Sequence, residues 1–140
     1  MAKALPTLIR MSKFEVDERQ RALADLLRAR DEIVRQQNEL EAQKNREEQS
    51  VREHPELSSY YAGYINVYLE RKEKLAKSLE DLDIIIDQAR RMLEEAYQQL
   101  KTYEITKDNI DKIELAELEL KDQKNADEMA LNTHRRKSKK

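Results

Sequence analysis

The chain has 140 residues, of which 40% are charged and 5% are aromatic, with one glycine and two prolines. So few turn-forming residues exclude a sheet protein, and the composition favours long helices. The absence of cysteine excludes disulfides, thiolate metal sites and cysteine nucleophiles. The formal charge is −2 overall, but residues 134–140 hold five basic side chains, so residues 1–133 carry −7.

The first predicted element is a helix over about residues 6–52, where Pro6 suits the first turn because its missing N–H is no loss. Apolar residues recur along this helix at heptad spacing and form a seam. The seam turns polar after Leu40, at positions such as Lys44. Its apolar members include Leu5, Ile9, Val16, Leu23, Leu26, Ile33 and Leu40.

A turn over about residues 53–58 follows, because the residue before Pro55 is driven away from helical angles. Ser58 and Ser59 are the expected N-caps of the next helix.

The second predicted helix covers about residues 59–133, and two interleaved heptad series mark its seam. A seam this long needs a partner stripe, which the first helix supplies in antiparallel pairing. One series is Ile65, Lys72, Leu79, Ile86, Leu93, Leu100 and Lys107, and the other is Tyr61, Tyr68, Leu75, Leu82, Ala89, Ala96, Tyr103 and Ile110.

Placing Leu40 opposite Leu75 also places Ile33 opposite Leu82 and Leu5 opposite Ile110. The first helix then has no further residues to pair, so the second helix overhangs beyond Ile110. We therefore predict an all-α fold, a long antiparallel two-helix coiled-coil hairpin with a longer, overhanging second helix. Residues 1–134 form a single domain in this prediction, and residues 135–140 form a basic tail.

Two surfaces are candidates for binding a partner. Tyrosines gather at the start of the second helix, where Tyr61 and Tyr68 lie on the seam while Tyr60 and Tyr64 are expected to point outward as interface anchors. The overhang keeps apolar residues without an internal partner, which indicates a docking surface. For the basic tail, a solvated, disordered end is favoured over an electrostatic contact, and nucleic acid is disfavoured because the remaining chain is acidic.

No constellation for chemistry emerges, so we predict a non-enzymatic protein without cofactor or metal. The acidic group around Asp83 and Asp87 is typical of a solvated coiled-coil flank, with Arg30 near both. His54 and His134 have no neighbours at metal-ligand spacing. A signal peptide's apolar core and a membrane-length apolar run are also missing, so we expect a soluble, cytoplasmic chain.

Four short motifs, in this order along the chain, resemble those of the flagellar FliJ family of export proteins. They are Leu5-Pro6-Thr7-Leu8, Glu15-Val16-Asp17-Glu18, the tyrosine-rich start of the second helix, and Asp127-Glu128-Met129-Ala130 before a basic end. The resemblance implies an antiparallel coiled coil similar to the rotor stalk of rotary ATPases. It implies a coupling or regulatory role in flagellar type III export, on the cytoplasmic side of the inner membrane.

The resemblance also implies partners and the residues that meet them. The terminal end would bind the hexameric export ATPase, the distal half would bind the membrane protein of the export gate, and export chaperones are further partners. Tyr68 matches an aromatic gate-binding position, whereas Lys72 departs from an expected apolar one. The implied gate-binding residues are Tyr60, Tyr64 and Tyr68, and the implied ATPase-facing residues are Glu15, Val16, Asp17, Asp127, Glu128 and Met129.

Two alternatives stay open at this point. One is a structural or chaperone-like coiled coil that forms homo-oligomers, and the other is the analogous stalk component of a virulence type III secretion system. A seam that pairs within one chain predicts a monomer before assembly, whereas the first alternative predicts a dimer.

Overall fold

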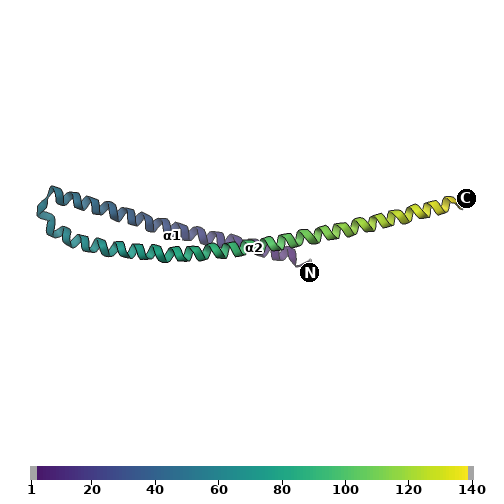
Figure 1. Cartoon of the computed structure of the whole chain (residues 1–140), viewed down its shortest axis with the longest axis horizontal. Helices are drawn as coiled ribbons and strands as arrows, with labels where there is room; N and C mark the ends of the chain where they lie inside the picture. The colour runs from purple at the N-terminus through teal and green to yellow at the C-terminus, as the bar shows by residue number, and fades with distance from the viewer. Residues whose placement is uncertain (1–2, 139–140) are drawn as a thin grey trace. The chain divides into compact units, whose positions relative to one another are not determined.

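The computed structural model describes residues 3–138, which form two helices and no strand. Helix α1 (Leu5–Glu53) has 49 residues and helix α2 (Ser58–Ser138) has 81 residues. One 3₁₀ turn, η1 (Pro55–Leu57), connects them (Figure 1). The predicted all-α hairpin with a longer second helix is therefore confirmed.

The chain reverses within very few residues. His54, with φ −133° and ψ 79°, leaves the helical conformation directly before Pro55, and the Leu57 N–H then donates to the His54 carbonyl at 3.0 Å. Ser58 is already helical, and its hydroxyl donates to the Pro55 carbonyl at 2.6 Å. Ser58 therefore closes the 3₁₀ turn instead of capping α2 from outside, because α2 already begins at Ser58.

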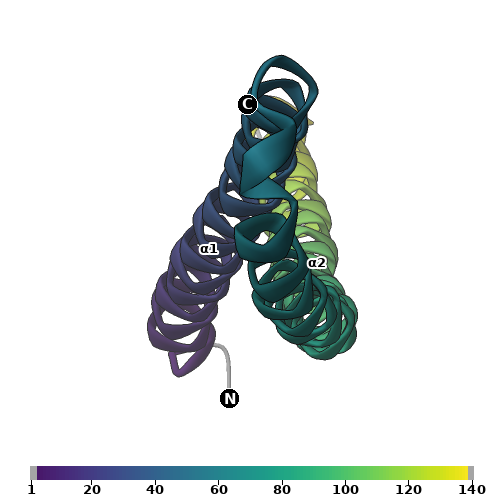
Figure 2. The same cartoon turned by 90° about the vertical axis from the view of Figure 1, so that its left-hand side faces the viewer.

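The chain divides into two compact units: residues 15–96, here called the turn unit, and residues 1–14 with 97–140, here called the terminal unit. In the turn unit, α1 and α2 lie side by side and antiparallel, and Figure 2 looks onto the end with the connection. The side chains between them are the predicted seam, of which Lys72 alone is exposed. Its most buried members are Val16, Leu40, Tyr68 and Ile86.

The terminal unit contains a short paired region and a long unpaired one. Leu5 and Ser12 of α1 are buried, and the seam positions of α2 are half-buried as far as Ile110. Every described residue from 111 to 138 is exposed. Pairing therefore ends where the heptad arithmetic placed the end of the first helix.

Helix α2 continues to Ser138, so residues 135–138 of the basic tail, which was expected to be disordered, are helical. The basic side chains of Arg135, Arg136 and Lys137 occupy the last turn, where they complement the negative end of the helix dipole. The Ser138 hydroxyl donates to the Arg135 carbonyl at 3.0 Å and satisfies one of the last free acceptors. Lys139 and Lys140 lie outside the described residues.

Candidate functional site

Tyr68 lies inside the seam of the turn unit, with only 3% of its surface exposed. Its hydroxyl donates to the Glu41 carboxylate. The ammonium groups of Lys44 and Lys72 lie 5.3 and 5.7 Å from the centroid of its ring. The charged side chains hold the ring by cation–π attraction and cover it. Tyr68 therefore offers little surface to a partner while the two helices stay together.

A second tyrosine completes this charged network across the two helices. The Tyr61 hydroxyl donates to Glu48 at 2.9 Å, and Lys44 lies 3.3 Å from Glu48 and 3.7 Å from Glu41. The hydrogen bond from Tyr68 lowers the pKa of Glu41, and the one from Tyr61 lowers the pKa of Glu48. Both carboxylates are thus held ionised, which explains why the polar stretch of the α1 heptads still packs against α2.

The other two tyrosines differ from each other. Tyr60 is 62% exposed and points outward as expected. Tyr64 is half-buried, because it lies one turn further along on the seam side, with its ring 6.2 Å from that of Tyr61. Its hydroxyl is buried without a hydrogen-bond partner among the described residues. Tyr60 is therefore the exposed anchor, and it shares one flank of α2 with Val67, which is also exposed.

The residues expected to face the ATPase fall in both units. In the turn unit, Glu15 accepts a hydrogen bond from Arg19 at 2.9 Å, Asp17 is exposed, and Val16 is buried in the seam. In the terminal unit, Asp127 and Glu128 are exposed, and so is Met129, which is 70% exposed. The side chain of Val16 therefore serves the packing of the two helices, and the other five are free to meet a partner.

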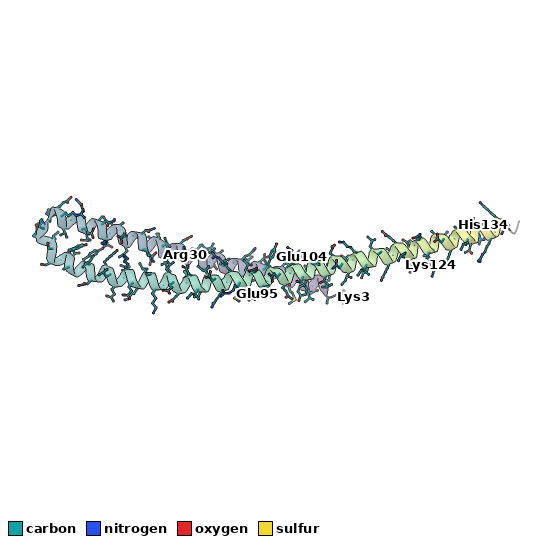
Figure 3. All side chains as sticks on the ribbon, in the orientation of Figure 1. Lys3, Arg30, Glu95, Glu104, Lys124 and His134 are labelled. Carbon is teal, nitrogen blue, oxygen red and sulfur yellow. The ribbon has the colours of Figure 1, made fainter. Side chains whose placement is uncertain are left out.

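The part of α2 that no other segment accompanies, residues 111–138, is here called the free segment; it includes Lys124 and His134 (Figure 3). Large apolar residues that gather on one segment and are each more than half exposed seldom stay uncovered in a soluble assembly. They occupy two roughly opposite sides of the helix at ~100° per residue. These large apolar residues are Ile113, Leu115, Leu118, Leu120, Met129 and Leu131.

The heptad ends at Ile110, and a different spacing, which the heptad pattern does not predict, replaces it. On one side, spacings of three, four, four and three residues lead from Leu115 to Met129, and Asp122 is the polar member of this series. The other side has the same spacing from Ile113 to Leu131, with Lys124 and Asp127 as its polar members. An 11-residue repeat of this kind follows a straight helix more closely than a heptad does. Counting spacings beyond Ile110 would have found both stripes.

The part of the chain that the structure describes has neither a group of metal ligands nor an apolar stretch of membrane length. No group of acidic or histidine side chains there could hold a metal ion. Between residues 3 and 138, neither helix has a stretch long and apolar enough to cross a membrane. A shallow groove of about 210 Å³ in the turn unit is open to solvent and has a largely charged and polar rim, including Arg35, Glu39 and Arg71.

Comparison with known proteins gives one finding. The sequence model of the family described as Flagellar FliJ protein matches residues 1–139. No curated protein and no solved structure matched the chain. The family match covers nearly the whole hairpin, both the turn unit and the free segment. The chain therefore belongs to the flagellar FliJ family, whose members are non-catalytic components of flagellar type III protein export.

Proposed function

We propose that this chain is a coupling factor of flagellar export. It binds the hexameric export ATPase through the terminal unit together with Glu15 and Asp17, and the membrane export gate through the part of the turn unit around Tyr60. It acts on the cytoplasmic side of the inner membrane, where its partners hold it. The family resemblance adds export chaperones as further partners. The flagellar family match favours this role over the stalk of a virulence secretion system.

The observation that carries the proposal is the free segment. Its 28 residues are all exposed, yet they present six large apolar side chains, among them Leu120 at 67% exposure. A helix without packing partners is only marginally stable in water. These apolar side chains therefore favour a bound state in which another protein covers them. Because the apolar residues occupy both sides of the helix, we expect the ATPase to contact it from more than one direction.

Removal of most of the free segment tests the proposed contact with the ATPase. A chain ending at Ile113 should no longer stimulate ATP hydrolysis by the purified export ATPase. Its paired helices should still unfold cooperatively in circular dichroism, because residues 114–138, the described part of what is removed, are all exposed. A chain lacking only residues 135–140 is the matched control, which separates the basic end from the apolar stripes. Full stimulation by the chain ending at Ile113 would show that the ATPase docks elsewhere.

The proposed contact with the gate protein is tested on the exposed flank of α2 in the turn unit. Tyr60→Ala combined with Val67→Ser changes two exposed side chains and leaves the seam intact. We expect weaker binding to the cytosolic domain of the gate protein in a titration, with an unchanged melting temperature. Ile84→Ser, an equally exposed apolar change on another face of α2, is the control. Equal gate binding by the double variant and the wild type would rule out this flank.

A further inference from the structure

One side of the free segment carries a stripe whose ends are apolar and whose middle is charged. Its spacing of three, four, four, three and four residues keeps all six members on one side of α2. All six are exposed. They are Ile113, Ala116, Leu120, Lys124, Asp127 and Leu131.

The part of this stripe from Leu120 to Leu131 is complementary to itself when reversed about the midpoint between Asn125 and Ala126. Leu120 and Leu131 are equally far from that midpoint, and so are Lys124 and Asp127. We propose that the free segment pairs in antiparallel orientation with the free segment of a second copy of this chain. Leucine then meets leucine at both ends of the contact, and lysine meets aspartate at its centre.

The flanking charges follow the same symmetry. Glu117 and Arg135 lie on one flank of the stripe, and the reversal brings them within one residue of facing each other. Among the described residues, Glu117, Lys124, Asp127 and Arg135 form no ion pair within their own chain. A parallel pair would instead place Lys124 against Lys124 and Asp127 against Asp127, which is repulsive. Charge therefore selects a second copy in the antiparallel direction.

Two-fold symmetry makes each contact occur twice, as in other self-complementary interfaces. The paired length from Glu117 to Arg135 is only ~27 Å at ~1.5 Å per residue, and each stripe holds few large apolar residues. We expect a weak, salt-sensitive dimer with a dissociation constant on the order of 10–100 µM. This pairing covers one of the two apolar stripes that the proposed ATPase docking also needs, so the dimer and the ATPase complex compete.

Sedimentation of the full chain, without any ATPase, tests the pairing through charge reversal. Lys124→Asp and Asp127→Lys should each weaken the dimer by about tenfold, because each change turns two symmetry-related attractions into repulsions. The double variant restores opposite charges at both contacts and should restore the dimer. Asp122→Lys, on the opposite side of the helix, makes the same charge change as Asp127→Lys and should leave the dimer unaltered.

Three results would overturn the proposed dimer. A wild-type chain that stays monomeric at several hundred micromolar overturns the proposal, and so does a dimer that both single variants retain. Failure of the double variant to recover also overturns it, because the central contact would then be misplaced. None of these measurements involves the ATPase, so their result is independent of whether the free segment docks on that partner.

Discussion

The Arg30 Nε lies 2.7 Å from the Asp83 carboxylate, and this contact joins α1 to α2 across the seam of the turn unit. It is the one ion pair between the two helices within residues 3–138. The sequence predicted Arg30 near Asp83 and Asp87, and Asp87 instead lies 3.8 Å from Arg90 on its own helix. A slip of one heptad in either direction would place Arg30 opposite Ala76 or Arg90, so this pair selects the register.

Removing either partner of this ion pair should destabilise the hairpin modestly. Because both side chains are partly exposed, Arg30→Ala and Asp83→Ala should each lower the free energy of unfolding by about 0.5–1 kcal/mol. Urea unfolding followed by circular dichroism measures this, and a double-mutant cycle isolates the pair. The exposed Arg28 and Asp25 pair within α1 is the control and should couple less. An equal coupling energy in the two cycles would show that the Arg30–Asp83 pair does not select the register of the helices.

Gly63 offers a stabilising substitution. It lies inside α2 with no positive φ, and a Cβ added there meets no atom within 4 Å. Gly63→Ala should therefore raise the free energy of unfolding by about 0.5–1 kcal/mol, because alanine restricts the unfolded chain and favours the helix. The neighbouring exposed Ala62→Gly should lower it by a similar amount. Two urea curves test both, and an unchanged midpoint for Gly63→Ala would indicate that α2 is frayed at this position.

The bond from Tyr68 to Glu41 should appear in the pH dependence of stability. This hydrogen bond is the main cause that lowers the pKa of Glu41 in the folded chain. Ionised Glu41 therefore stabilises the fold above the ordinary glutamate pKa, and that stabilisation is lost as the pH falls through the lowered value. Tyr68→Phe should be less stable than the wild type at neutral pH, with the difference shrinking below about pH 4.

Thermal melts between acid and neutral pH measure this difference. Tyr97→Phe is the matched control, because Tyr97 is exposed and its hydroxyl has no hydrogen bond among the described residues. It should show no stability change at any pH in this range. A Tyr68→Phe deficit that persists unchanged in acid would assign the effect to packing of the ring edge instead.

Hydrogen exchange should divide α2 at Ile110. Backbone amides of residues 113–138 should exchange nearly as fast as those of a free peptide helix, because no buried side chain supports them. Amides around Tyr68 and Ile86, the most buried residues of α2, should exchange slowest. Peptide-level mass spectrometry resolves the two regions in dilute protein. Slow exchange throughout the free segment at low micromolar concentration would mean that something already covers it.

The heptad pattern was sufficient to predict the pairing of the helices and its end at Ile110, because burial of apolar side chains at that period dictates a two-helix seam. Contacts between polar side chains were harder to predict. Glu41, Glu48 and Lys44 occupy a stretch where the α1 heptads appear broken, and their partners on α2 are tyrosines. Sequence spacing cannot reveal such bonds, since they depend on which side chains meet across the seam.

The exposure of the candidate binding residues could also be predicted only in part. Exposure of Met129 and its acidic neighbours follows directly from the missing partner stripe beyond Ile110. Val16 is buried as its heptad position predicted, although the family resemblance turned it toward the ATPase. The half-burial of Tyr64 does not follow so directly, because Tyr64 lies between a seam position and a flank. A rotation of a few tens of degrees about the helix axis decides whether such a side chain is covered.

The brevity of the connection at His54 and Pro55 also constrains how chains of this type can change length during evolution. With no slack between the helices, residues inserted into one helix of the turn unit must be matched by an equal number in the other, or Arg30 and Asp83 are separated. Whole heptads added to both helices together preserve the seam. Beyond Ile110 no such matching is needed, so that part of α2 can lengthen or shorten without disturbing the seam.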